Sequence, residues 1–142
     1  EWLNGLAGRF AHDAEAPARI GDFWLHRACY AQVRQWYEKG KAVFKKEHGT
    51  YTGRLAEVLL AEKNPAEARR IIEAGLSHTP EDPLLRAYQS ALDLDNANTS
   101  QRNAARTKLE AISARLPNSP FVRFHLGRAY LRDGDVLRAG QQ

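Results

Sequence analysis

The side chains with the most potential for chemistry are one cysteine and five histidines. His26 precedes Cys29 by one helical turn, a spacing that would place an imidazole beside a thiol and allow a reactive thiolate. A buried free cysteine among Trp24, Ala28 and Tyr30 is the alternative, and the one we favour. Because the chain has a single cysteine, no internal disulfide can form.

No two histidines have the spacing of a helical zinc site, in which they lie one turn apart with an acidic base between them. A metal site assembled in space is the disfavoured alternative, and its candidate ligands are His12, His26, His48, His78 and His125. The sequence also lacks a nucleophile elbow, a phosphate loop and a glycine-rich dinucleotide fingerprint. We therefore expect no catalytic residue, no metal and no cofactor in this chain.

Charge and hydropathy narrow the possible partners. The 142 residues carry a formal net charge of +4, with 21 basic and 17 acidic side chains interspersed, which describes a mixed solvated surface rather than a nucleic-acid-binding stripe. The densest basic patch, from Lys39 to His48, predicts a solvated helix face, with phosphate binding as the alternative. No apolar run reaches the roughly 18 residues of a membrane span, so we expect no membrane insertion.

The elements that must position any site are clearest between Thr50 and Pro83, where two helices are predicted. Asn64 is expected to cap the second helix, Pro65 to occupy its first position, and Glu67 to reach back to the Asn64 backbone N–H. Helices joined by so short a turn pack antiparallel and need neighbours to bury their apolar faces. The two apolar stripes are Leu55, Ala56 and Leu59, then Ala68, Ile72, Gly75 and Leu76.

The same punctuation recurs downstream. Asp82 before Pro83, and Ser119 before Pro120, each predict a capped helix start directly after a proline stop. With Gly49, these starts repeat about every 34 residues. In the last unit, Leu126 and Tyr130 are expected to be buried, and Gly127 to let two helices touch.

The first third of the chain has weaker punctuation. The spacing of apolar residues predicts a short helix over residues 2–11 and a longer one over residues 18–38. Gly40 is expected to end the longer helix. A further short helix is expected around residues 42–44, and Gly49 is expected to end it. The expected buried positions of the longer helix are Phe23, Trp24, Ala28, Ala31 and Tyr37.

These residues resemble the tetratricopeptide repeat (TPR) family over about residues 49–142. The matching positions are Leu126, Gly127, Ala129, Tyr130, Gly134, Asp135 and Ala139 in the last unit, and Leu55, Ala56, Leu59, Ala68, Ile72 and Pro80 in the central one. The resemblance implies an all-α, right-handed α-solenoid of antiparallel helix pairs, with about three to four repeats and the last one truncated. The expected divisions are N-terminal helices forming a degenerate repeat over residues 1–48, then repeats over 49–82, 83–119 and 120–142 (partial), in one continuous domain.

In such a repeat the first helices line a concave face. The positions expected there, which we predict contact a partner, are Glu57, Tyr88, Phe121, Phe124, Arg128 and Arg132. The alternative for each aromatic is packing against neighbouring helices. Family members that clamp a peptide carboxylate use several Lys, Asn and Arg side chains here, whereas only Arg128 and Arg132 are basic in this chain. An amphipathic helix, an extended apolar segment or another domain of the same polypeptide is therefore the expected partner.

The leading function hypothesis is a protein–protein interaction scaffold within a larger bacterial cell-envelope protein. The order of elements after Gly21 resembles the C-terminal TPR region of BepA-like periplasmic zinc metalloproteases of outer-membrane protein quality control, although the zinc-binding helix that defines them is absent here. The repeat scaffold of an exopolysaccharide export system is a second resemblance, and an enzyme using Cys29 or a histidine is third. The resemblances imply a periplasmic or cell-envelope location, with the cytoplasm as the alternative; the residues themselves assign no compartment and no oligomeric state.

Overall fold

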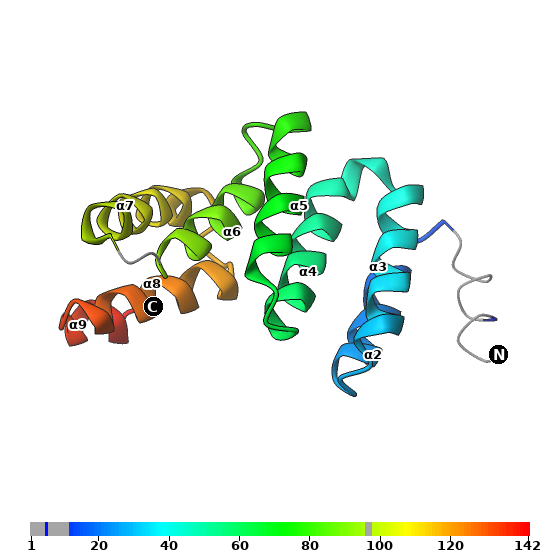
Figure 1. Ribbon diagram of the computed structural model, residues 1–142, viewed down its shortest axis with the longest axis horizontal. Helices are drawn as coiled ribbons and strands as arrows, with labels where there is room; N and C mark the ends of the chain where they lie inside the picture. The colour runs from blue at the N-terminus through cyan, green and yellow to red at the C-terminus, as the bar shows by residue number, and fades with distance from the viewer. Residues whose placement is uncertain (1–4, 6–11, 96–97) are drawn as a thin grey trace. The chain divides into compact units, whose positions relative to one another are not determined.

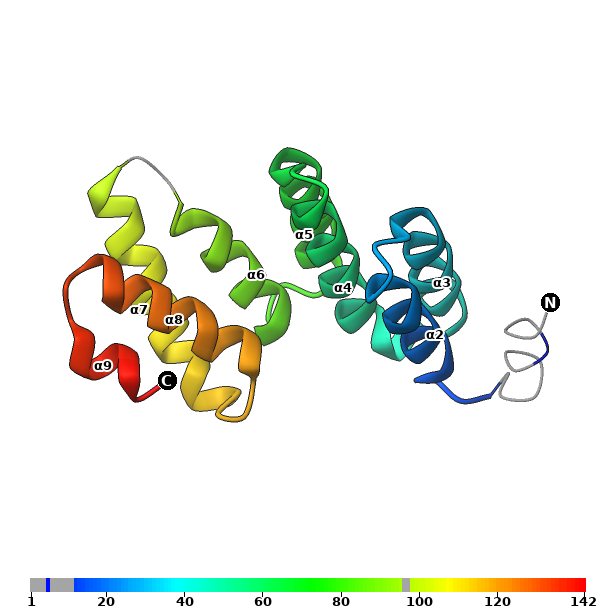
Figure 2. The same ribbon diagram turned by 90° about the horizontal axis from the view of Figure 1, so that it is seen from below.

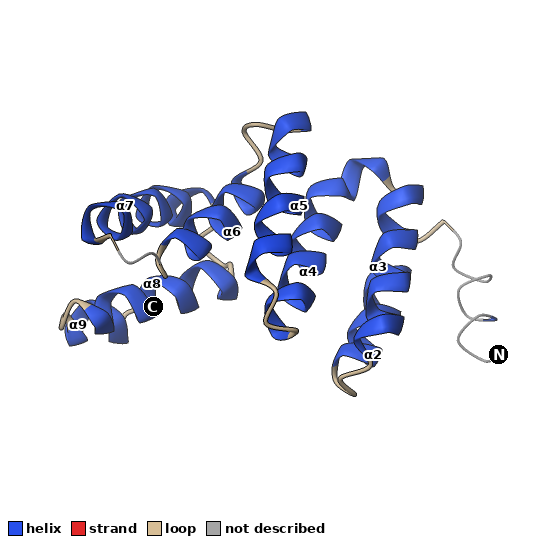
Figure 3. Cartoon of the chain, viewed as in Figure 1, coloured by secondary structure: helices blue, strands red, loops and turns tan. Residues whose placement is uncertain are grey.

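The computed structural model describes residue 5 and residues 12–95 and 98–142. All regular secondary structure in these residues is helical (Figure 3), so the expected all-α class is confirmed. The helix expected over residues 2–11 lies outside the described residues. The helices are α2 (Ala16–Leu25), α3 (Tyr30–Val43), the 3₁₀ helix η1 (Lys45–Glu47), α4 (His48–Ala61), α5 (Pro65–His78), α6 (Pro83–Asp93), α7 (Thr99–Arg115), α8 (Pro120–Arg132) and α9 (Val136–Gly140).

The chain forms two compact units, Glu1–Pro80 and Glu81–Gln142. Unit 1 contains α2 to α5 and unit 2 contains α6 to α9, and within each unit every helix packs against the next one along the chain (Figures 1 and 2). In the residues that the structure describes, each unit therefore contains two helical hairpins. Helices begin at His48, Pro83 and Pro120, close to the expected repeat starts. The repeat boundaries themselves stay a prediction.

The helix starts use the expected capping residues. The Asn64 side chain accepts the Glu67 N–H at 3.3 Å, and Asp82 Oδ1 accepts the backbone N–H of the two residues that follow Pro83. Ser119 Oγ likewise accepts a backbone N–H of the first turn of α8. The reciprocal contact expected from Glu67 is wrong, because its carboxylate binds Arg70 instead, at 2.5 and 2.8 Å.

Three hairpin turns share one backbone geometry. Ala28, Lys63 and Gly134 have φ values of 54°, 59° and 78°, in the left-handed region. In each turn the N–H of the next residue reaches back to a carbonyl of the preceding helix, which is a Schellman C-cap. These bonds run from Cys29 to Trp24 O at 3.1 Å, from Asn64 to Leu59 O at 2.8 Å and from Asp135 to Tyr130 O at 2.9 Å. The turn reverses the direction of the chain, and the next helix begins two residues after the left-handed residue.

The first third differs from its expected boundaries. A single helix over residues 18–38 is wrong, because α2 ends at Leu25 and α3 begins only at Tyr30. Gly40 does not break a helix: it lies buried inside α3, where a Cβ would come within 2.1 Å of the Tyr51 ring. Gly49 lies inside α4 rather than ending a helix. Both glycines are buried, and at Gly40 the missing side chain leaves room for the Tyr51 ring.

The unexpected break also changes which side chains are buried. Of the expected positions in this region only Tyr37 is fully buried, whereas Phe23 is 37% exposed. Val33 and Trp36 occupy the core instead. Four residues outside any helix separate α2 from α3. The buried face therefore does not continue with helical spacing from α2 into α3, and treating residues 18–38 as one helix assigned the wrong residues to the core.

The core of unit 1 is centred on two tyrosines. Tyr37 and Tyr51 are each 1% exposed, and their ring centroids lie 6.3 Å apart. Asp22 Oδ1 accepts hydrogen bonds from Tyr37 Oη and Arg54 Nη1, both at 2.5 Å, and thereby ties α2 to α3 and α4. Burial, followed by the Asp22 carboxylate, raises the pKa of Tyr37 well above its usual range.

The core of unit 2 contains the residues expected from the repeat pattern. Leu126 is 1% exposed and Tyr130 is 7% exposed, which confirms that both are buried. They pack with Leu109 of α7 and Val122 of α8. The Tyr130 hydroxyl donates to Glu110 Oε1 at 2.9 Å, so α7 and α8 are joined by a polar contact as well as by apolar packing.

Candidate functional site

The six side chains expected on the concave face fall in both units. Glu57 lies half-buried on α4 of unit 1. Tyr88 lies on α6, and the remaining four lie on α8, so unit 2 brings five of the six together. The five form an aromatic stack and an arginine pair.

The aromatic stack begins in the core and ends at the surface. Tyr88 lies against Phe121 with ring centroids 4.1 Å apart, and Phe121 lies 4.4 Å from the His125 ring. Phe124 meets His125 edge-on at 5.2 Å. Tyr88 is only 4% exposed, whereas Phe124 is 63% exposed. Tyr88 therefore supports the stack, and Phe124 is the member that a partner can contact.

His125 contributes an uncharged aromatic ring to this stack. Its Nδ1 atom is buried and has no hydrogen-bond partner in the described residues. Burial, reinforced by the positive charge of Arg128 and opposed by Asp95, lowers the pKa of His125 to about 4. The imidazole is consequently neutral near pH 7 and serves as packing surface rather than as a charge.

The arginine pair shares one carboxylate. Asp95 Oδ1 accepts from Arg128 Nη2 at 3.2 Å and from Arg132 Nη2 at 3.0 Å. Arg132 also donates to the Leu94 carbonyl at the end of α6, so it has a clear structural role. Arg128 lies with its guanidinium 5.9 Å from the centre of the Phe124 ring. Two cations against one carboxylate leave excess positive charge beside the exposed phenyl ring.

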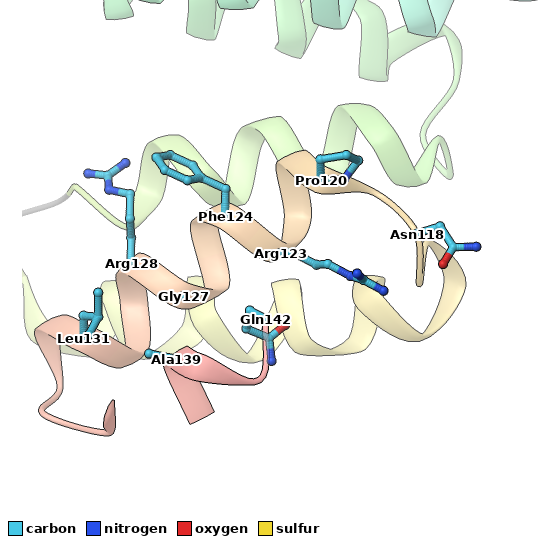
Figure 4. Close-up of a pocket in the computed structure, with 9 residues that line it drawn as sticks. All are labelled: Asn118, Pro120, Arg123, Phe124, Gly127, Arg128, Leu131, Ala139 and Gln142. Carbon is cyan, nitrogen blue, oxygen red and sulfur yellow. The ribbon is translucent and has the colours of Figure 1, made fainter. Parts of the chain in front are cut away.

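A cavity of about 490 Å³ adjoins this surface (Figure 4). It is lined by residues of α8, the turn before it and the end of the chain: Asn118, Pro120, Arg123, Phe124, Gly127, Arg128, Leu131, Ala139 and Gln142. Leu131 is 59% exposed. Arg123 donates to the Pro117 carbonyl at 2.7 and 3.0 Å and has no carboxylate partner among the described residues. The cavity thus combines exposed apolar side chains with two arginines.

Gly127 lies in the lining of this cavity instead of at a tight helix contact. A Cβ at Gly127 would meet the Ala139 carbonyl at 3.7 Å and Gln142 Cβ at 3.8 Å, which are ordinary contact distances. The expected close approach of two helices at Gly127 is therefore wrong. Its missing side chain leaves open space beside Phe124 and Leu131.

Sequence reasoning missed three residues of this surface: Arg123, His125 and Leu131. His125 lies one helical turn after Phe121, and this spacing was the available signal for the stack. Leu131 could not be found by pattern, because apolar residues at its spacing are normally buried. Arg123 carries no distinguishing motif.

The thiol pair expected as an alternative does not form. His26 follows the last residue of α2 and its Nδ1 lies 2.7 Å from the Asp22 carbonyl. Cys29 lies beyond the Ala28 turn, and its Sγ contacts the Arg27 carbonyl at 3.5 Å. In the described part of the chain, no group of three or more His, Cys, Asp or Glu side chains is placed to hold a metal ion. The described helices include none with both the length and the apolar character needed to cross a bilayer.

Comparison with known proteins supports the fold. No family model matches the sequence, and no curated protein matches it. The solved structure of the MamA RS-1 ArsTM double mutant is similar to this chain, with a TM-score of 0.54 and 20% sequence identity over 98% of this chain and 76% of that one. This likeness, with the all-helical architecture, shows a TPR-like helical repeat fold of the α-solenoid class. The resemblance to BepA-like proteases is not shown by any comparison.

Proposed function

We propose that this chain is a non-catalytic protein-binding module, and that the surface formed by Phe124, Leu131, Arg123 and Arg128 receives an apolar partner segment that also carries a carboxylate. The observation that carries the proposal is the 63% exposed phenyl ring of Phe124 beside the α8 cavity, with an arginine on each side of it in the sequence. The TPR-like fold supports a binding role, because helical repeats present extended surfaces to partners.

The energetics of this surface favour association. Burying a Phe or Leu side chain contributes about 1.5–3 kcal/mol relative to leaving it in water. Aromatic and arginine side chains are also the types enriched among residues that dominate binding free energy. Arg123 and Arg128 add specificity, since both can meet a partner carboxylate beside the apolar anchor. Arg123 has no carboxylate partner among the described residues, and Arg128 shares Asp95 with Arg132.

The less exposed residues of the stack support the exposed Phe124 ring. Phe121 packs between Tyr88 and His125, and His125 in turn packs against the Phe124 ring. A ring held in place loses little conformational entropy when a partner covers it. This geometry supports Phe124 as the anchor and Tyr88 as its support.

We further propose that the module belongs to a larger bacterial cell-envelope protein. This part rests on the resemblance of its repeat pattern to the C-terminal region of periplasmic zinc metalloproteases, with the scaffold of an exopolysaccharide export system as the alternative. The parent gene discriminates between them. An HExxH helix encoded upstream would support the protease setting, and its absence from the whole gene would exclude it.

The binding proposal is tested by selecting peptides from a random 16-residue display library on the purified chain. We expect enriched peptides to combine a bulky apolar residue with Asp or Glu. Selected peptides should bind Phe124→Ala and Arg128→Glu at least about tenfold more weakly, because each change removes about 1.4 kcal/mol or more of interaction.

Two matched controls separate this surface from general effects. Val43→Ala removes a 58% exposed apolar side chain in unit 1, and Arg115→Glu makes the same charge change on an exposed part of α7. Both should bind the peptides like wild type. Circular dichroism checks that all four variants are folded. Peptides without the apolar–acidic combination, or equal binding by Phe124→Ala and Val43→Ala, would refute the proposal.

A further inference from the structure

A second cavity, in unit 1, has a strongly basic lining. It measures about 550 Å³ and lies where α3, η1 and the end of α5 meet. Its lining includes four nitrogen-bearing side chains, Lys41, Lys45, His48 and His78, and Glu38 is the one carboxylate among the described residues that line it. This cavity is separate from the α8 surface and plays no part in the function proposed above.

The two lysines of this cavity have no partner for their ammonium groups among the described residues. Neither Lys41 nor Lys45 forms an ion pair or a hydrogen bond through its ammonium group in the described part of the chain. Lys41 is half-buried, so part of its hydration is lost without a compensating anion. The last turn of α3 favours a cation, which gives Lys41 a local role. Lys45 lies beyond that helix, on η1, and is exposed.

Two histidines from α4 and α5 line the same cavity and add further hydrogen-bond donors to it. The His48 and His78 rings lie edge to face with centroids 6.3 Å apart, one at the start of α4 and the other at the end of α5. Residues far apart in the sequence thus bring two imidazoles to the wall that the lysines line. Each imidazole can donate a hydrogen bond, and each ammonium group can donate three.

We infer that this cavity binds a phosphate-class dianion. A carboxylate offers two oxygens, whereas a phosphoryl group offers three terminal oxygens and a second negative charge, which suits a cavity lined by two lysines and two histidines better. The volume exceeds that of an inorganic phosphate ion, so the group is either free phosphate with water or a phosphomonoester whose remaining atoms fill the space. The shared chemistry is the tetrahedral dianion.

The test is an NMR titration of the full chain at constant pH and ionic strength, in a buffer without phosphate. Imidazole resonances are followed while inorganic phosphate or O-phosphoserine is added in exchange for chloride. Saturable shifts of His48 and His78, without a matching shift of His125, are expected. Tighter binding of O-phosphoserine would identify an ester as the preferred form, and equal binding would identify the free ion.

Charge variants show whether the lysines form the site. Lys41→Gln and Lys45→Gln should each weaken binding about tenfold, because each removes one charge-assisted contact. Lys46→Gln is the matched control: it makes the same change on η1 at an exposed lysine that does not line the cavity. Shifts that grow linearly without saturation, or equal affinity of Lys45→Gln and Lys46→Gln, would overturn the inference. A heat-denaturation scan confirms that the variants are folded.

Discussion

Gly40 lies directly against the ring of Tyr51. A Cβ built on Gly40 would come within 2.1 Å of Tyr51 Cζ and 2.3 Å of Cε1, far inside van der Waals contact. Tyr51 cannot move away easily, because it is 1% exposed and its hydroxyl donates to the Ala14 carbonyl at 2.6 Å. The contact brings α3 and α4 together at the centre of unit 1.

Gly40→Ala should therefore destabilise the protein by about 1–3 kcal/mol, the usual cost of overpacking a core. Gly127→Ala is the matched control, since its added Cβ meets nothing nearer than 3.7 Å. Alanine is favoured over glycine within a helix by up to about 1 kcal/mol, so the control should be neutral or stabilising. Urea denaturation followed by circular dichroism measures both. A Gly40→Ala variant as stable as wild type would mean that the Tyr51 ring has room to shift.

The contrast between these glycines shows what the sequence could and could not predict. Helix pairs, their capping residues Asn64, Asp82 and Ser119, and the buried Leu126 and Tyr130 were predictable, because caps and apolar spacing act locally. Gly40 was read as a helix breaker and Gly127 as a close contact, and both assignments were wrong. A glycine's role depends on the side chain opposite it, and no local pattern contains that information.

The candidate site was predictable only in part. Phe121, Phe124 and Arg128 were named from their spacing on one helix, and the structure brings them together with Tyr88. Which of them is exposed depends on three-dimensional packing, and so does the carboxylate that Arg128 and Arg132 share. The spacing of residues determines which face of a helix they share, but it does not determine which other helices cover that face.

The raised pKa of Tyr37 predicts that the protein loses stability at alkaline pH. Burial raises the pKa of its hydroxyl, with the Asp22 carboxylate as a second cause. In the unfolded chain a tyrosine ionises near pH 10. Above that pH the unfolded state releases a proton that the folded state retains, so the contribution of Tyr37 to stability is complete below about pH 10 and is lost as the pH rises further.

Tyr37→Phe should flatten this alkaline decline, although it also removes the hydrogen bond to Asp22 and lowers stability near pH 7 by about 0.5–1.5 kcal/mol. Urea midpoints measured from pH 7 to pH 11 give both effects. Tyr30→Phe is the control, because Tyr30 packs at the edge of the same core and its hydroxyl has no partner among the described residues. Parallel pH curves for wild type and Tyr37→Phe would contradict the assignment.

The lowered pKa of His125 predicts that the protein loses stability at acidic pH. Its pKa is lowered to about 4 by burial and by Arg128, against a value near 6.5 in the unfolded chain. As the pH falls from about 6.5 towards 4, the unfolded state takes up a proton that the folded state does not. The stabilising contribution is therefore present above pH 6.5 and is lost as the pH falls through this range.

An NMR titration should show the His125 imidazole ionising near pH 4, provided that the protein stays folded. His125→Phe keeps an aromatic ring between Phe121 and Phe124 but cannot ionise, so its stability should fall less steeply between pH 6.5 and 4 than that of wild type. A His125 that titrates near 6.5 would mean that the ring is solvated, and the aromatic stack would then be looser than its 4.4 Å spacing indicates.

Lys63 and Gly134 provide a reciprocal test of the hairpin turns. Both occupy the left-handed position of a Schellman turn, with φ of 59° and 78°. This conformation costs an ordinary residue roughly 1–2 kcal/mol, and glycine nothing. The Lys63 side chain is exposed, and the space around Gly134 is open within 4 Å, so backbone strain is the main contribution to the change in stability at both sites.

Lys63→Gly should therefore stabilise the protein by about 0.5–1 kcal/mol, and Gly134→Lys should destabilise it by a similar amount, as measured by urea denaturation. Ala28 occupies the same position in the turn between α2 and α3, which carries no glycine, proline or asparagine and therefore gave no turn signal in the sequence. Ala28→Gly should behave like Lys63→Gly. Opposite signs for the Lys63 and Gly134 variants support equivalent turns. If Lys63→Gly were destabilising instead, the lysine side chain would have to hold a contact that outweighs the strain of its backbone.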